Sequence, residues 1–324
     1  MAALIAPARL ACLPRLTRRR FVSGCATAAA APWLLPATLE ATGSAPSTRF
    51  PASPRERVAV ASYPFREFIA GSEHKQGNPV VELKDFAAHV VEKFHVNRIE
   101  PWTAHFPSTD PKYLAEFRAA VEKAHSGVAN IAVDGEDSPY AADLAERSKA
   151  VAFSKRWIDV AVAIGSPSVR TNIPAAKDAK PNLERLAESL QQVAEYGASK
   201  NVVVHLENDN PVSEDPFFLV QVIEKVKSPW LHALPDFGNT LNAHEEEYAY
   251  RAIDAMFGQA YGICHVKDGE VNQSGKATRV DLARTFGILK QHGYKGYCSI
   301  EYDSPGEPYK STAELVEKTI TYLR

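Results

Sequence analysis

From residue 57 onward, short apolar runs alternate with longer amphipathic segments. The short runs are typical of parallel strands that are covered on both faces. They lie at Val58–Tyr63, Arg98–Pro101, Val128–Asp134, Ser168–Thr171, Val202–Glu207, Leu231–Pro235, Gly262–Val266 and Tyr297–Tyr302. Between them, apolar residues recur every three or four positions, as in the helices expected over 82–94, 183–200 and 312–323. Eight strand–helix units over roughly 270 residues predict an α/β protein with a single (β/α)8 TIM barrel.

A doubly wound open sheet is the alternative architecture. Such a sheet usually has a glycine-rich turn after its first strand, whereas Tyr63-Pro64-Phe65 follows the first run here. The sequence also contains neither a G-x-G-x-x-G fingerprint nor a G-x-S-x-G nucleophile motif. These absences argue against the common nucleotide-binding and serine-hydrolase classes.

The first fifty residues differ from the rest of the chain. The 324 residues carry a net charge of −2, but residues 1–45 hold five basic residues and one acidic residue, which leaves 32 basic and 38 acidic residues beyond them. The acidic remainder argues against a nucleic-acid partner. The basic segment contains Thr17–Ser23, a twin-arginine motif, followed by the Ala-rich run Gly24–Leu35 and a stretch rich in Pro and small residues.

This order of charged, apolar and small residues is typical of an export signal. We therefore expect a twin-arginine signal and linker over 1–50, a barrel over 51–324, and a periplasmic or extracellular protein without a membrane span in its mature form. A disordered basic tail and a lipoprotein motif at Cys25 are the alternatives. Of the four cysteines, Cys264 and Cys298 lie in the barrel, where strand alternation predicts that both face outward as buried apolar residues.

The last four predicted strands all end on a metal-ligating side chain. These residues are Glu207, Asp236, His265 and Glu301. Because the carboxyl ends of barrel strands meet at one face, the four side chains should converge. Three carboxylates and one imidazole suit Mn²⁺, Mg²⁺ or Co²⁺, and Zn²⁺ also fits.

Four motifs at these strand ends carry a family resemblance: VVVHLEN, LPDFGN, CHVKD and GYKGYCSIEYD. They resemble the second half of the xylose isomerase-like barrel family, which includes ketose 3-epimerases, hydroxypyruvate isomerase and inosose dehydratase. The resemblance implies that Glu207, Asp236, His265 and Glu301 bind the metal and that Glu207 and Glu301 are catalytic. It further implies a metal-dependent sugar isomerase or epimerase that transfers a proton alpha to a carbonyl through an enediolate.

Three other functions remain as alternatives. The same enolate chemistry could expel a leaving group, which would make the protein a lyase or dehydratase acting on keto-sugars. A metal-dependent apurinic endonuclease would need several metals and a basic face, which the acidic barrel does not offer. A sugar-binding barrel without catalysis is the third. We expect a small sugar-like substrate as the partner, and the sequence leaves a homo-oligomer open.

Six further residues near the strand ends are expected to bind substrate: Glu100, Trp102, Arg170, His205, Asn239 and Lys267. For Glu100 the competing interpretation is a salt bridge within the barrel mouth. For Arg170 it is an ion pair with a barrel carboxylate, and for His205 it is a core histidine. Asn239 stands where many ketose epimerases have a histidine, and Val271 stands where they have an arginine, so the substrate contacts should differ from theirs. The segment Phe65–Pro79 is expected to be either a lid over the site or an exposed loop.

Overall fold

The computed structural model describes residues 44–324, apart from 211, 272–274, 276 and 304–306. The twin-arginine motif and the Ala-rich run lie outside the described residues. The expectation of an export signal therefore stays a prediction.

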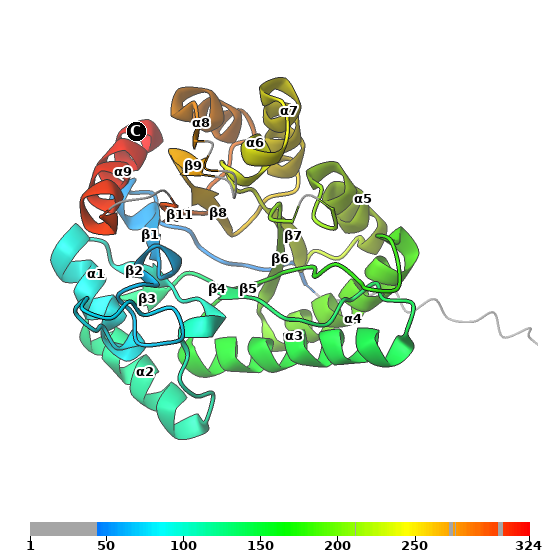
Figure 1. Ribbon diagram of the computed structural model, residues 1–324, viewed down its shortest axis with the longest axis horizontal. Helices are drawn as coiled ribbons and strands as arrows, with labels where there is room; N and C mark the ends of the chain where they lie inside the picture. The colour runs from blue at the N-terminus through cyan, green and yellow to red at the C-terminus, as the bar shows by residue number, and fades with distance from the viewer. Residues whose placement is uncertain (1–43, 211, 272–274, 276, 304–306) are drawn as a thin grey trace, which may run out of the picture. The chain divides into compact units, whose positions relative to one another are not determined.

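Eight parallel strands form the centre of the described body, and helices surround them (Figure 1). The strands are β1 (Val58–Ala61), β2 (Arg98–Glu100), β3 (Gly127–Val128) continued by β4 (Ile131–Val133), β5 (Ser168–Thr171), β6 (Val203–Glu207), β7 (Leu231–Leu234), β8 (Ile263–Val266) and β11 (Tyr297–Ile300). Each of the eight predicted strands is confirmed. The third is split at Ala129 and Asn130, where the Asn130 side chain donates a hydrogen bond to Glu100.

The strands pair in two groups that join at both edges. One sheet has the order β3-β2-β1-β11-β8 and the other β4-β5-β6-β7. Parallel bridges between Trp102 and Ala132 and between Asp236 and His265 connect the two sheets. The predicted TIM barrel is therefore confirmed, and its carboxyl-terminal strand ends share one face.

The helices pack their apolar sides on the outside of the barrel, where the main hydrophobic core lies. They are α1 (Phe86–Phe94), α2 (Pro111–Lys123), α3 (Leu144–Ile164), α4 (Leu183–Lys200), α5 (Pro216–Val226), α6 (Asn239–Ala243), α7 (Glu246–Phe257), α8 (Leu282–Gln291) and α9 (Pro308–Leu323). Cys264 and Cys298 belong to this outer core, as predicted. None of the helices in the described part of the chain is long and apolar enough to cross a membrane.

Local sequence sets the helix ends. The Asp143 carboxylate accepts a hydrogen bond from the Ala145 amide at the start of α3, and Gly165 ends that helix with a φ of 77°. The predicted helix over 82–94 begins as a 3-10 turn at Leu83–Asp85 before α1. The last helix begins earlier than predicted, at Pro308, because Glu307 accepts hydrogen bonds from its first amides.

Two short elements at the carboxyl-terminal face were not predicted. One is α6, and the other is an antiparallel hairpin of β9 (Gly269–Val271) and β10 (Ala277–Arg279). Segments of three to five residues are too short to show a hydrophobic period, so the sequence gives no signal for them. They contribute Asn242 and Glu270 to the pocket described below.

The segment from Ser44 to Arg57 closes the amino-terminal end of the barrel. Ser44 accepts a hydrogen bond from the Trp230 indole at 3.0 Å, and the Phe50 ring packs edge-on against Tyr261 and Tyr297. The guanidinium of Arg57 donates hydrogen bonds to backbone carbonyls near the start of β11. The packed body thus extends at least to Ser44, earlier than the boundary at residue 51 expected from the sequence.

Candidate metal and substrate site

Four strand ends bring the predicted metal ligands together. Ligand atoms of Glu207, Asp236, His265 and Glu301 all lie within 4.8 Å of one another, and all four residues are buried. Glu207 is the last residue of β6, Asp236 follows β7, His265 lies in β8 and Glu301 follows β11. Odd-numbered positions of β6, β8 and β11 face inward, which is why the chain aims these side chains at one point.

The imidazole of His265 lies at the centre of this cluster. Its Nδ1 atom is 2.8 Å from Glu207, 3.2 Å from Glu301 and 3.9 Å from Asp236. Its Nε2 atom faces the carboxylate of Glu100 at 3.0 Å. Burial lowers the pKa of His265, but the surrounding carboxylates outweigh burial and hold that pKa well above its usual value.

The cluster fits a divalent cation. Burial, opposed by the charge of Lys267 and helped by those of Glu207 and Glu301, raises the pKa of Asp236 to about 8. Within the described residues, no hydrogen bond satisfies the buried Oδ2 atom of Asp236, and the ammonium of Lys267 lies 3.5 Å from it. A buried carboxylate oxygen without a hydrogen bond, among other carboxylates and one imidazole, suits a hard or borderline cation.

Two buried basic side chains contact the predicted catalytic glutamates, Glu207 and Glu301. The Nε atom of Arg170 lies 2.8 Å from Oε2 of Glu207, and its guanidinium also pairs with Asp134. Arg170 therefore forms ion pairs with barrel carboxylates, which was the competing interpretation of this residue. The ammonium of Lys267 lies 3.3 Å from Glu301 and donates a hydrogen bond to Asn239 at 2.8 Å.

A pocket of about 860 Å³ opens above the cluster. Four of the six predicted substrate residues line it, together with both catalytic candidates. These lining residues are Trp102, Arg170, Asn239, Lys267, Glu207 and Glu301. Val271 lines the pocket as well, so the position where many ketose epimerases have an arginine is apolar at this wall.

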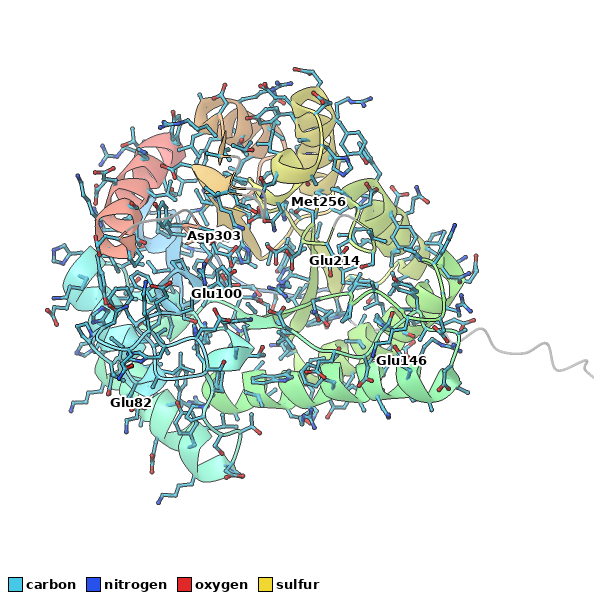
Figure 2. The ribbon with its side chains drawn as sticks, in the orientation of Figure 1. Glu82, Glu100, Glu146, Glu214, Met256 and Asp303 are labelled. Atoms are coloured by element: carbon cyan, nitrogen blue, oxygen red, sulfur yellow. The ribbon has the colours of Figure 1, made fainter. Side chains whose placement is uncertain are left out.

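The expectation that Glu100 binds substrate needs correction. Glu100 has no exposed surface and does not line the pocket. Its carboxylate is turned into the barrel, where it faces His265 and accepts a hydrogen bond from Asn130 at 2.7 Å. Figure 2 shows Glu100 inside the ring of helices, whereas Glu82 lies at its edge.

His205 also lies outside the pocket and is corrected to a core histidine. It is fully buried two residues below Glu207 on the same inner face, and Nε2 accepts a hydrogen bond from the Gly262 amide at 3.3 Å. Burial holds the pKa of His205 well below its usual value, so the ring is neutral. The sequence correctly predicted that His205 shares the inner face with Glu207. Its position two residues earlier on β6 places its side chain below the pocket.

Trp102 is held rigidly at the pocket wall. Its indole donates a hydrogen bond to Asp134 at 2.5 Å, and its amide donates one to Ser62 at 2.9 Å. The rings of Tyr63 and His105 contact it edge-on, with centroid separations of 5.2 and 5.0 Å. A ring fixed on several sides offers a flat apolar surface at little conformational cost.

Several pocket residues were missed by the sequence analysis. Asp134 is the last residue of a predicted strand, so the strand-end rule applied to the first half of the barrel would have found it. Asp209 follows β6 closely, and burial raises its pKa to about 6. Glu73 and Glu270 come from a loop and the β9–β10 hairpin, where the sequence gives no positional signal.

Comparison with known families decides the classification. The profile of the xylose isomerase-like TIM barrel family matches residues 82–324. The chain belongs to this family. In this chain the four clustered residues lie within the motifs that carry the resemblance to the family. A search of curated protein sequences finds no significant match.

Solved structures share the fold of this xylose isomerase-like barrel. A D-allulose 3-epimerase from Methylomonas sp. has a TM-score of 0.65 and 15% identity, covering 85% of this chain and 100% of its own. A xylose isomerase-like protein from Mycobacterium smegmatis in complex with magnesium has a TM-score of 0.62 and 16% identity, covering 82% and 96%. A xylose isomerase domain protein from Planctomyces limnophilus has a TM-score of 0.61 and 20% identity, covering 85% and 98%.

Proposed function

We propose that this protein is a divalent-metal-dependent sugar isomerase or epimerase. The observation that carries the proposal is that Glu207 and Glu301 both line the pocket and both belong to the cluster with Asp236 and His265. Family membership and solved relatives that include epimerases of D-allulose and L-ribulose support the same class of reaction.

Glu207, Asp236, His265 and Glu301 would hold the cation. A bound divalent cation would act as a Lewis acid on the substrate carbonyl, which makes the proton on the adjacent hydroxyl-bearing carbon easier to remove. Mn²⁺, Mg²⁺ and Co²⁺ are the ions that this donor set favours, and Zn²⁺ also fits it.

The two glutamates are arranged for proton transfer. Arg170 fixes the carboxylate of Glu207, while Lys267 and His265 hold the pKa of Glu301 well below its usual value against the effect of burial. The Glu301 carboxylate is therefore available as a proton acceptor at neutral pH, and Arg170 orients the carboxylate of Glu207. One removes the proton alpha to the carbonyl to give an enediolate, and the other returns a proton to the opposite face or to the neighbouring carbon. Trp102 supplies a flat wall against which the sugar carbons can pack.

Solvent deuterium exchange tests this function. Purified protein reconstituted with Mn²⁺ is incubated in D₂O with D-fructose, D-allulose, D-tagatose or L-ribulose, and exchange at C1 and C3 is followed by NMR. We expect exchange with at least one ketose, and loss of at least 100-fold in Glu301→Gln because one of the two proton carriers is removed. Product mass separates isomerisation from elimination. An unchanged rate in the variant contradicts the proposal, and so does an absence of exchange with every ketose, whether free or carrying a further sugar.

We further propose that the chain is exported by the twin-arginine route. The support is the motif Thr17–Ser23 followed by the Ala-rich run. Replacing Arg18 and Arg19 by lysine should retain the protein in the cytoplasm, as measured by fractionation of cells that express the full chain. Equal amounts of wild type and variant outside the cytoplasm would contradict the export proposal.

A further inference from the structure

A second pocket lies beside the first. It has a volume of about 640 Å³, and its lining includes Arg66, Phe68, Lys75, Asn78 and Glu307. Asp303 and Val271 line both pockets, so the two cavities are contiguous at these residues. Figure 2 shows Asp303 between α9 and the barrel centre. Part of the segment Phe65–Pro79, expected to be a lid or a loop, thus forms a wall of this second pocket.

Arg66 forms the boundary between the two cavities. Its guanidinium lies 3.1 Å from Asp303 and 3.5 Å from Glu73, and 4.3 Å from the centroid of the Tyr63 ring. Tyr63 and Glu73 line the first pocket, whereas Arg66 lines the second. A ligand that extends from Glu301 past Asp303 would therefore meet a fixed row of hydrogen-bonding groups.

The walls of the second pocket suit an uncharged polyhydroxy group. Phe68 is half-buried and rests edge-on against Tyr309, with 5.3 Å between the ring centroids. Asn78 adds an amide, and the ammonium of Lys75 is paired with Glu67 at 3.6 Å. Charged groups of both signs nearly balance, so the pocket has no excess of cations to attract a phosphate or carboxylate. Aromatic rings beside hydrogen-bonding side chains match the apolar carbons and hydroxyls of a sugar ring.

The volume of the first pocket points the same way. At about 860 Å³ it already lies at the upper end of the range for pockets that hold a drug-sized ligand, and the second pocket adds a comparable space. A single ketose in contact with Glu207 and Glu301 would leave the second pocket unused. Binding energy from a remote part of a substrate can be used to position its reacting part.

We propose that the second pocket binds a glycosyl group attached to the reacting sugar, so that the preferred substrate is a glycosylated ketose rather than a free one. This inference rests on the proposed function, because it assumes that the ketose reacts between Glu207 and Glu301. The glycosyl ring would lie across Phe68, and Arg66 and Asp303 would contact the linkage between the two rings.

The test compares free and glycosylated ketoses in the same exchange assay. The Mn²⁺-loaded protein is given D-fructose, isomaltulose, which carries glucose on O6 of fructose, or maltulose, which carries it on O4. We expect kcat/KM for at least one disaccharide to exceed that for fructose by at least tenfold. In Phe68→Ala, the ratio of the two values should fall at least tenfold.

Phe217→Ala is the matched control variant. Phe217 is also half-buried and also rests edge-on against a tyrosine, with 5.3 Å between its centroid and that of Tyr248, but it lies on α5. The ratio should not change in this variant. Two results would overturn the second pocket as a glycosyl site while the proposed function stands. One is that free ketoses exchange and both disaccharides exchange equally fast or more slowly. The other is that Phe68→Ala leaves the ratio of kcat/KM for disaccharide to that for fructose unchanged. Absence of exchange with every free and glycosylated ketose overturns the proposed function itself.

Discussion

The carboxylate of Glu100 lies 3.0 Å from Nε2 of His265, on the opposite side of the imidazole from Glu207 and Glu301. Asn130 donates a hydrogen bond to this carboxylate and accepts one from Ser168, so a chain of buried polar groups reaches from β5 to the imidazole. A cation at the cluster would displace the proton from Nδ1 of His265, and the acceptor Glu100 would keep the remaining proton at Nε2. Nδ1 is then left as a lone-pair donor that faces the carboxylate cluster.

Glu100→Gln should therefore weaken metal binding without removing a ligand. Partners of this kind typically contribute 10- to 100-fold to metal affinity, so we expect the Kd for Mn²⁺ to rise by about that factor. Competition with a chromophoric chelator measures it. Glu214→Gln is the control, because Glu214 is also a buried acid but hydrogen-bonds the Ile173 amide instead. An equal loss of affinity in both variants would assign the effect to general destabilisation.

The cation should stabilise the fold most at high pH. Burial holds the pKa of Asp236 at about 8, above its unfolded value near 4, so the folded chain without metal binds more protons between those values. Its stability must then fall as pH rises through this window, by up to about 1.4 kcal/mol per pH unit for one such group. Thermal melts from pH 5 to 8 with a chelator should show a falling Tm, and Mn²⁺ should restore it most at pH 8. A Tm that rises with pH in the chelated protein would refute this; Asp236→Asn should flatten the slope.

Anionic sugars should be poor substrates. Seven carboxylates line the first pocket, namely Glu73, Asp134, Glu207, Asp209, Glu270, Glu301 and Asp303, against two cations, Arg170 and Lys267. Even with a divalent cation the charge remains negative, so a phosphate group would be repelled. We expect kcat/KM for fructose 6-phosphate to be at least tenfold below that for fructose, with the gap narrowing at high salt. A faster reaction with the phosphate would show that the acidic rim does not select the substrate.

The segment before residue 51 should contribute to stability. The Phe50 ring packs on Tyr261 and Tyr297 at the amino-terminal end of the barrel, whereas the neighbouring Arg49 is exposed. Phe50→Ala should lower the free energy of unfolding by about 1–3 kcal/mol, because a half-buried aromatic contact is lost. Arg49→Ala should change it by less than about 0.5 kcal/mol. Chemical denaturation measures both, and equal effects would argue against a packed role for this segment.

The strand-end rule predicted that Glu207, Asp236, His265 and Glu301 converge, but it predicted the residues around them less well. Strand alternation fixes which face a side chain occupies, so Glu207 and His265 could be placed on the inner face from the sequence alone. The rule does not give the height along the barrel axis, and two residues correspond to about 6.6 Å. Because of this difference in height, His205 lies in the core and not at the pocket, where it had been expected. Glu100 turns inward to contact His265 and Asn130. Both partners lie far from it in the sequence, so its orientation could not be predicted from local pattern.

The parts of the pocket contributed by loops could not be predicted. Glu270 lies in a hairpin and Glu73 in a long loop, and neither segment has a hydrophobic period. The position of Arg66 between two cavities likewise depends on long-range contacts with Asp303. Periodicity therefore predicted the barrel and the cluster, whereas the features that select the substrate depend on tertiary contacts.

The central claim is that Glu207, Asp236, His265 and Glu301 bind one divalent cation. Crystals of the protein loaded with Mn²⁺ test it most directly, with diffraction data collected on both sides of the manganese absorption edge. We expect a single anomalous peak within about 2.0–2.4 Å of one atom from each of the four residues. A peak elsewhere, or none at the cluster in Mn²⁺-saturated crystals, would contradict it.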